Sequence, residues 1–140
     1  MTIGDRRGAA YHEAGHIAVA WALGVEVGAA AIGINGDNAK GTAAIGDDEG
    51  LPLLDKIALC AAGLESQSMF DAPTHRYAGT MDEARIIELT EDLDEKSRDD
   101  GYQRAHNLIK AHATTVDRIA KNLLAKGSLT QAEVCSLLEI

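Results

Sequence analysis

Residues 12 to 16 read His-Glu-Ala-Gly-His, and this pattern constrains the fold more than any other feature of the sequence. The surrounding residues favour a helix, because alanines and other good helix formers dominate from Ala9 to Leu23. On a helix, His12 and His16 lie one turn apart and about 40° apart in projection, so their ring nitrogens can converge on one metal ion. A helix with the H-E-x-x-H pattern can hold zinc and place Glu13 beside the attacking water. The sequence therefore predicts a metal-binding helix over residues 5–23.

The expected ends of this helix carry suitable signals. Asp5 is a favourable first-turn or N-cap acid, and Gly24 is suited to the position just after the last turn. Gly15 interrupts the helix formers at a cost of about 1 kcal/mol relative to alanine. Two explanations fit it: another backbone or a substrate approaches the helix closely, or the helix packs tightly against a neighbour.

The two imidazoles do not complete a catalytic zinc site. Such a site usually has three protein ligands and leaves a fourth position open. The longer zinc signature with a third histidine shortly after the second is absent, since Ile17 to Trp21 contain none. Spacing alone leaves the third ligand open among a downstream carboxylate, His75, His106 and His112.

Three segments resemble the peptidase domain of the FtsH-type ATP-dependent zinc metalloproteases. Residues 10–20 resemble the active-site helix of that family, residues 57–63 its buried helix ending in an Ala-Gly pair, and residues 78–84 the start of the helix that carries an aspartate ligand. The resemblance spans roughly residues 8–135 and implies a zincin-like helical domain in which Asp82 is the third zinc ligand. His75, close to Asp82 in sequence, is the best substitute.

Three positions depart from the pattern of the family. Leu64 stands where an arginine usually follows the Ala-Gly pair, Gln67 lies nearest to the usual glutamate, and Met81 replaces the usual asparagine before the aspartate. The three ligands are still present, but the residues that would support them and bind substrate differ from those of the family. The chain also contains no G-x-x-x-x-G-K-[ST] phosphate loop, so we expect a protease domain without an ATPase domain.

Length and composition favour one domain over residues 1–140, mainly α with a small β component (α+β). The chain has 140 residues, 46% of them hydrophobic and only 4% aromatic. Residues 25–46 are predicted to form a β-hairpin next to the metal-binding helix, with strands over 25–34 and 39–45 and a turn over 35–38. Residues 51–140 are predicted to be helical, with a helix over 51–70, a connection over 71–78, breaks near Gly101 and Gly127, and a last helix capped by Ser128 or Thr130.

Charge and cysteine content limit the partners and the location. The net charge is −9, and residues 82–100 are the most acidic stretch, so we expect no nucleic-acid partner. This stretch is either a solvated helix face or a surface that also attracts a basic peptide. Cys60 and Cys135 lie in apolar helical stretches, which favours buried reduced thiols over a disulfide. Because neither a membrane segment nor a secretory signal is evident, we expect a cytoplasmic protein.

Together these features predict a zinc metalloendopeptidase that cleaves peptides or unfolded proteins. His12, His16 and Asp82 would hold Zn²⁺, and Glu13 would act as the general base. The strand beside the metal-binding helix either is only structural or pairs with extended substrate. The alternative function is a binding or regulatory module that keeps the metal without proteolysis, although a purely structural site has no chemical need of Glu13. A homo-oligomer or a separate ATPase partner is compatible with both.

Overall fold

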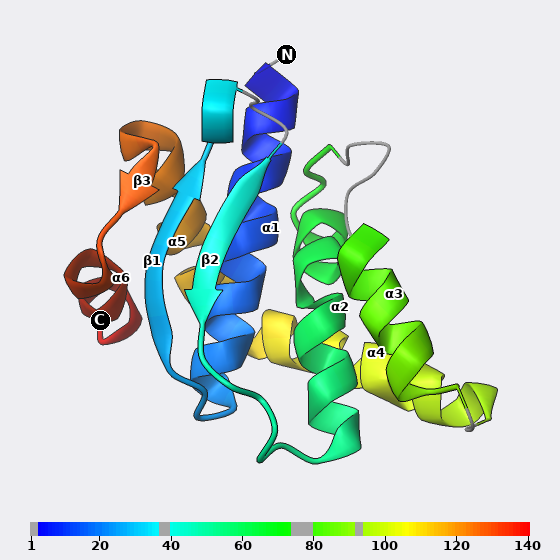
Figure 1. The fold of residues 1–140 in the computed structure, drawn as a ribbon. Helices are drawn as coiled ribbons and strands as arrows, with labels where there is room; N and C mark the ends of the chain where they lie inside the picture. The colour runs from blue at the N-terminus through cyan, green and yellow to red at the C-terminus, as the bar shows by residue number, and fades with distance from the viewer. Residues whose placement is uncertain (1–2, 37–39, 74–79, 92–93) are drawn as a thin grey trace.

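A computed structural model describes residues 3–36, 40–73, 80–91 and 94–140 (Figure 1). These residues form a mainly helical fold with a small antiparallel sheet, which confirms the predicted fold class. The elements are α1 (Ile3–Ala22), β1 (Val27–Ile32), the 3-10 turn η1 (Ile34–Gly36), β2 (Gly41–Ile45), α2 (Leu53–Met69), α3 (Thr80–Leu89), α4 (Glu95–Ala111), α5 (Ala113–Lys126), β3 (Ser128–Leu129) and α6 (Gln131–Leu138).

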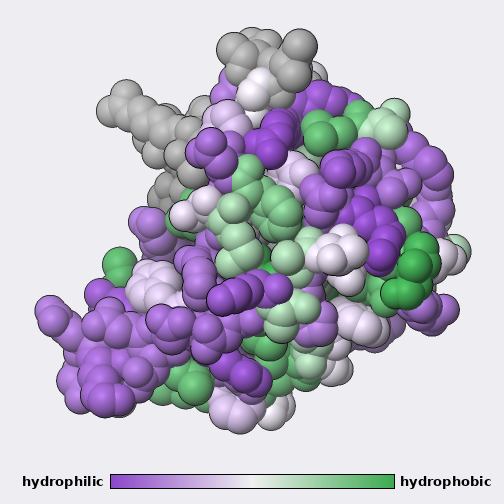
Figure 2. All heavy atoms as spheres, turned by 180° about the vertical axis from the view of Figure 1, so that it is seen from behind, coloured by the Kyte–Doolittle hydropathy of each residue, from purple (hydrophilic) through white to green (hydrophobic). Residues whose placement is uncertain are grey.

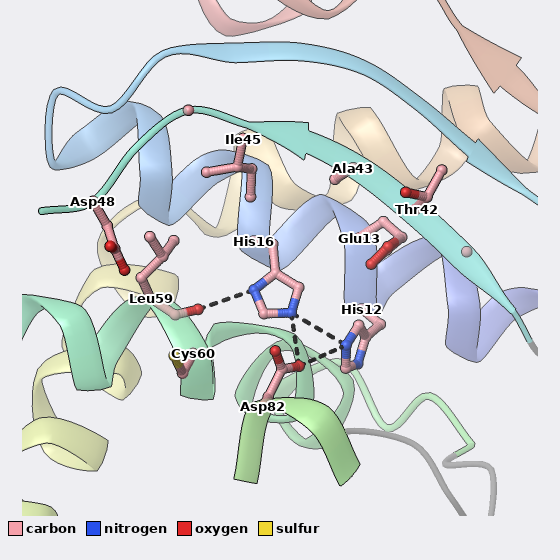
Figure 3. Close-up of a pocket in the computed structure, with 12 residues that line it drawn as sticks. His12, Glu13, His16, Thr42, Ala43, Ile45, Asp48, Leu59, Cys60 and Asp82 are labelled. Carbon is pink, nitrogen blue, oxygen red and sulfur yellow. Dashed lines mark hydrogen bonds and ion pairs between the residues drawn. The ribbon is translucent and has the colours of Figure 1, made fainter. Parts of the chain in front are cut away.

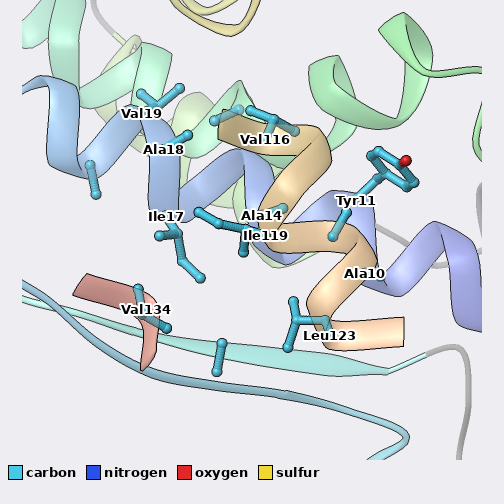
Figure 4. Packing of buried hydrophobic residues seen from close by; sticks show 14 of the residues in the cluster. Ala10, Tyr11, Ala14, Ile17, Ala18, Val19, Val116, Ile119, Leu123 and Val134 are labelled. Atoms are coloured by element: carbon cyan, nitrogen blue, oxygen red, sulfur yellow. The ribbon is translucent and has the colours of Figure 1, made fainter. Parts of the chain in front are cut away.

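Helix α1 runs through the centre of the main core. The sheet covers one side of α1, while α2 and α5 pack along it (Figure 1). Its small residues Ala10, Ala14 and Ala18 are fully buried and allow the neighbouring elements to approach closely. Larger buried side chains from α5 and α6, including Ile119 and Val134, fill the space around them (Figure 4). The helix predicted from the H-E-x-x-H pattern is thus the central helix of the fold.

The sheet has the strand order β2-β1-β3, and both pairings are antiparallel. Strands β1 and β2 form the predicted hairpin, with Ala30 opposite Ala43 and a register irregularity between Val27 and Ala30. Both strands are shorter than predicted, and residues 37–39 of the connection lie outside the described residues. Strand β3 was not predicted; its two residues extend the hairpin to three strands by pairing with the other edge of β1.

The predicted break near Gly101 is wrong. Helix α4 continues through Gly101, which is buried against α2. A Cβ atom at this position would lie 2.2 Å from the Cγ2 atom of Ile57, so the glycine lets the two helices approach instead of ending α4. The helical segment is instead interrupted between Leu89 and Glu95, which separates α3 from α4, and at His112, between α4 and α5.

The other predicted helix ends agree with the structure within a few residues. Gly24 and Gly127 both have a φ of +79° and follow α1 and α5. Thr130 caps α6 through a capping box with Glu133, which decides between the two predicted caps. The connection predicted over 71–78 is described only as far as Pro73.

The acidic stretch lies mostly at the surface. Asp94, Glu95, Asp99 and Asp100 are all exposed at the start of α4. Hydrophilic side chains dominate this corner on the face opposite to that of Figure 1 (Figure 2). Cys60 and Cys135 are free thiols, and both are half-buried where buried thiols were predicted. None of the helices in the described ranges has the length and apolar character that a membrane span requires.

Candidate metal centre

Two helices bring three potential ligands to one point. His12 and His16 come from α1, and Asp82 comes from the first turn of α3 (Figure 3). The Nε2 atoms of the two histidines are 3.2 Å apart, and Asp82 Oδ2 lies 3.3 Å from His12 Nε2 and 3.1 Å from His16 Nε2. These three residues form a group that could hold a metal ion. The predicted candidates from distant parts of the chain therefore do meet.

The spacing of the three atoms fits a tetrahedral zinc ion. Ligand atoms about 2.0–2.1 Å from such an ion are about 3.3 Å from one another. The three observed separations lie between 3.1 and 3.3 Å. Two imidazole nitrogens and one carboxylate oxygen are also a common donor set for zinc. Both geometry and chemistry therefore fit the metal that the sequence predicts.

Helix α2 orients both imidazole rings. The Nδ1 atom of His16 donates to the carbonyl oxygen of Leu59 at 2.9 Å, and the Nδ1 atom of His12 donates to Gln67 Oε1 at 2.7 Å. The Gln67 amide is itself fixed, because its Nε2 atom donates to the carbonyl oxygen of Pro73 at 2.8 Å. With the proton on each Nδ1, the Nε2 lone pairs face Asp82. Three electron-rich atoms that converge in this way require a cation or a proton between them.

The proximity of His12, His16 and Asp82 shifts the pKa values of His12 and Asp82. When the His12 ring takes up a second proton, its Nε2 atom can donate to Asp82. Burial lowers the pKa of His12, but this hydrogen bond to Asp82 and the nearby Glu13 carboxylate outweigh it, so the pKa lies above its ordinary value. Burial acts in the opposite direction on Asp82, yet the hydrogen bonds with His12 and His16 hold the pKa of that carboxyl well below its usual range. Asp82 is therefore ionised at neutral pH, as a metal ligand must be.

Close packing between α1 and α2 depends on two glycines. A Cβ atom at Gly15 would lie 2.5 Å from Ser66 Cβ and 2.6 Å from the carbonyl oxygen of Ala62. A Cβ atom at Gly63 would lie 2.5 Å from two atoms of the His12 ring. Gly15 is therefore explained by tight packing against the backbone of α2. Gly63 leaves the space that the His12 ring fills.

Glu13 is a buried carboxylate with an unsatisfied oxygen. Its residue exposure is 6%, and within the described structure its Oε2 atom has no hydrogen-bond partner. Burial raises the pKa of Glu13, although His16 and His12 nearby lower it. Gly41 of β2 makes room for it, because a Cβ atom there would lie 2.7 Å from Glu13 Cγ. An unpaired buried carboxylate costs stability, so a water molecule, an ion or a substrate group is expected beside this oxygen.

A groove of about 350 Å³ runs between β2 and the helices that carry the ligands (Figure 3). It is lined by His12, Glu13, His16, Gly41, Thr42, Ala43, Ile45, Gly46, Asp48, Leu59, Cys60 and Asp82. Cys60 lies in the wall but does not belong to the converging group. Burial raises the pKa of its thiol to about 11, so it stays protonated at neutral pH. The ligand group therefore borders a space that a substrate can enter.

The other histidines do not join the described centre. His106 Nδ1 pairs with Glu65 Oε1 at 2.6 Å, and His112 packs edge-on against Trp21 at the junction of α4 and α5. His75, the predicted substitute ligand, lies outside the described residues. Among the described candidates, Asp82 is the one that lies beside His12 and His16.

Sequence reasoning missed several groups that support the centre. Gln67 stood out only as a departure from the pattern of the family, and its position one helix away from His12 could have suggested a hydrogen bond. The Leu59 carbonyl oxygen belongs to the backbone and leaves no signal in the sequence. Gly41 looked like an ordinary strand residue, since its contact with Glu13 depends on how the sheet packs on α1.

No protein-family model matches this chain, and a search of curated proteins found no significant match. The resemblance to the FtsH-type peptidases therefore stays a prediction that rests on the three segments.

Proposed function

We propose that this chain is a zinc-dependent metalloendopeptidase related to the FtsH-type peptidase domains, and that it hydrolyses peptide bonds in peptides or unfolded proteins. The observation that carries the proposal is Glu13. In the described part of the chain its buried Oε2 atom has no hydrogen-bond partner, and Glu13 lines the same groove as three potential ligands whose atoms are 3.1–3.3 Å apart. A purely structural site would not need this carboxylate.

Three protein ligands would leave the fourth position of a tetrahedral ion open for chemistry. A zinc ion held by His12, His16 and Asp82 would act as a Lewis acid toward a substrate carbonyl and bring the pKa of a water molecule to about 7. Glu13 would accept a proton from the attacking water at Oε2 and pass it to the leaving amine.

The position of β2 supports an extended substrate. Strand β2 is at an edge of the sheet, and Gly41 to Ile45 follow the groove that contains Glu13 and the ligand group. An extended peptide can add to such an edge through main-chain hydrogen bonds, which recognise the backbone and not a particular sequence. This mode of binding is suited to peptides and unfolded chains, and folded proteins offer few segments of this form.

The test compares the wild-type protein with Glu13→Gln. Zinc content is measured on protein purified without added metal, and hydrolysis is measured with casein and a quenched fluorescent peptide. Both proteins are expected to bind one zinc ion, while Glu13→Gln loses about 10²- to 10⁴-fold in turnover, the usual contribution of general acid–base catalysis. Removal of the metal with a chelator should abolish turnover, and added zinc should restore it.

Glu139→Gln is the matched control, because Glu139 is exposed near the end of the chain and far in sequence from the ligands. It should behave as wild type. Equal turnover by Glu13→Gln would refute the role of Glu13. Zinc-loaded wild-type protein without turnover would favour a binding or regulatory module that keeps the metal.

A further inference from the structure

A second cavity lies directly beside the groove. It has a volume of about 260 Å³ and lies between α2, α3 and α4. Cys60 and Asp82 line both this cavity and the groove. Its other lining residues are Ala61, Leu64, Glu65, Ser68, Glu83, Ile86 and Tyr102. A substrate residue next to Asp82 in the groove is therefore close to a space large enough for a long side chain.

The cavity has apolar walls and acidic groups. Ala61, Leu64 and Ile86 provide hydrocarbon surface, while Glu65 and Glu83 contribute carboxylates. Burial raises the pKa of Tyr102, and the Glu83 carboxylate raises it further, while Arg98 lowers it. This combination matches a side chain with an aliphatic stem and a positively charged end.

Among the described residues, cations do not pair with every carboxylate of the cavity. The nine lining residues include no lysine or arginine. The arginines of α3 and α4 also have other partners: Arg85 pairs with Asp48 and Glu88, Arg98 donates to Thr90, and Arg104 pairs with Asp55. Arg85 and Arg98 do approach the cavity wall, where they lower the pKa values of Cys60 and Tyr102. His106 pairs with Glu65, but within the described residues Glu83 has no ion-pair partner. The Glu83 carboxylate is therefore available to a ligand.

We propose that this cavity is a specificity subsite that receives the lysine or arginine side chain of a peptide lying in the groove; this inference rests on the proposed peptidase function. The stem of the basic side chain would contact Leu64 and Ile86, and its charged end would meet Glu83 and Glu65. An apolar side chain would desolvate these carboxylates without compensation, and an acidic one would be repelled. Zinc would offset the charge of Asp82, so Glu65 and Glu83 set the preference.

The test measures peptide binding without hydrolysis. Zinc-loaded Glu13→Gln protein is titrated with fluorescent peptides that carry arginine or citrulline at one position, and this position is moved along the peptide. Citrulline has nearly the same shape as arginine but no charge. We expect roughly tenfold tighter binding of the arginine peptide at one position only, as a charge-assisted hydrogen bond would give.

Substitutions in the same background locate the effect. Glu83→Gln should remove most of the arginine preference, and Glu65→Gln part of it, with little change in the affinity for the citrulline peptide. Glu88→Gln is the control, because it removes the same charge from α3 at a side chain that is 72% exposed and outside the cavity. It should keep the full preference.

Several results would overturn the subsite: no arginine preference at any position, a preference that survives both cavity substitutions, or an equal loss in Glu88→Gln. The last result would indicate general attraction by an acidic surface. The outcome is independent of the test of catalysis. Arginine-selective binding without turnover by wild type would support the subsite and refute the peptidase activity. Turnover by wild type without an arginine preference would support the peptidase activity and refute the subsite.

Discussion

The two parts of the candidate metal centre differ in how firmly the fold holds them. His12 and His16 belong to α1, where Ala14, Ile17 and Ala18 are fully buried. Asp82 belongs to α3, where only Ile86 is buried among the described side chains and Met81 is 82% exposed. Two candidate ligands thus belong to a helix of the core, and the third comes from a lightly packed helix. Because elements with few buried contacts open at low free-energy cost, metal binding should also fix α3 against α2.

The largest expected effect contrasts the ligands of the two regions. His12→Ala should abolish zinc binding at micromolar concentrations, because it removes a ligand from the preformed pair. Asp82→Asn should weaken zinc binding on the order of 10- to 100-fold, since the amide oxygen remains but the charge is lost. Titration against a competing chelator measures both affinities, and circular dichroism checks the fold. Unchanged affinity in Asp82→Asn would mean that α3 does not supply the third ligand.

Packing between α1 and α2 is tested by Gly63→Ala. The added methyl group has no space beside the His12 ring, so the free energy of unfolding should fall by about 1–3 kcal/mol, and zinc binding should weaken. Gly50→Ala is the control, because a Cβ atom there meets nothing within 4 Å. Chemical denaturation with and without zinc measures both variants. If Gly63→Ala and Gly50→Ala have the same free energy of unfolding, the His12 ring can move aside without cost.

The support given by α2 is tested by Gln67→Leu. This change removes the acceptor of the His12 Nδ1 proton and the donor to the Pro73 carbonyl oxygen. Zinc affinity should fall about 10- to 100-fold, as is usual when an outer-shell partner is lost. Gln67→Glu restores an acceptor for His12 and should recover part of that loss. Cobalt binding and the visible spectrum of the cobalt-loaded protein provide a second readout. If Gln67→Leu binds the metal as tightly as wild type and has the same cobalt spectrum, the orientation of the His12 ring does not depend on the Gln67 amide.

The smallest expected effect concerns the two acids of the centre, whose pKa values shift in opposite directions. The pKa of Glu13 is raised above its ordinary value of 4.5 in the folded protein. Below pH 4.5 the carboxyl is protonated in both the folded and unfolded states and costs nothing. As pH rises through the folded pKa, the buried charge destabilises the fold. Metal-free Glu13→Gln should therefore be more stable than wild type at pH 7, by about 1–2 kcal/mol, with the difference closing near pH 4.

Denaturation in the presence of a chelator at several pH values measures this difference. If the difference in unfolding free energy between Glu13→Gln and wild type stays constant with pH, it comes from the shape of the side chain and not from its charge. Asp82 has the opposite sign, because its depressed pKa gives a stabilising contribution that is present at neutral pH and lost as the pH falls.

The sequence was most informative where a local pattern determines local geometry. The spacing of His12 and His16 on a helix directly predicts convergent nitrogens, and the hairpin and the capped last helix follow from short-range signals. Asp82 could be assigned only through a family resemblance, because no spacing rule connects residues that are 66 positions apart. The structure brings it to the histidines through the packing of α3 on α2.

The failures have a common physical cause in contacts between distant segments. Gly101 was expected to end a helix, but its missing side chain accommodates Ile57 from α2. Strand β3 has two residues, too few for a periodic pattern, and exists because β1 offers it a free edge. The role of Gln67 depends on a hydrogen bond across two helices. Single-sequence patterns describe neighbours along one element and do not contain such pairings.

Because the strand order is β2-β1-β3, the two edges of the sheet are formed by β2 and β3, and these edges differ in their tendency to self-associate. Strand β3 is very short and continues almost at once into α6, whereas β2 presents five residues at its edge. Open edges attract other extended chains, including the same strand of another molecule. Two copies joined through β2 would cover each other's groove. Peptide affinity that declines as protein concentration rises would be the direct sign of this competition between recognition and aggregation.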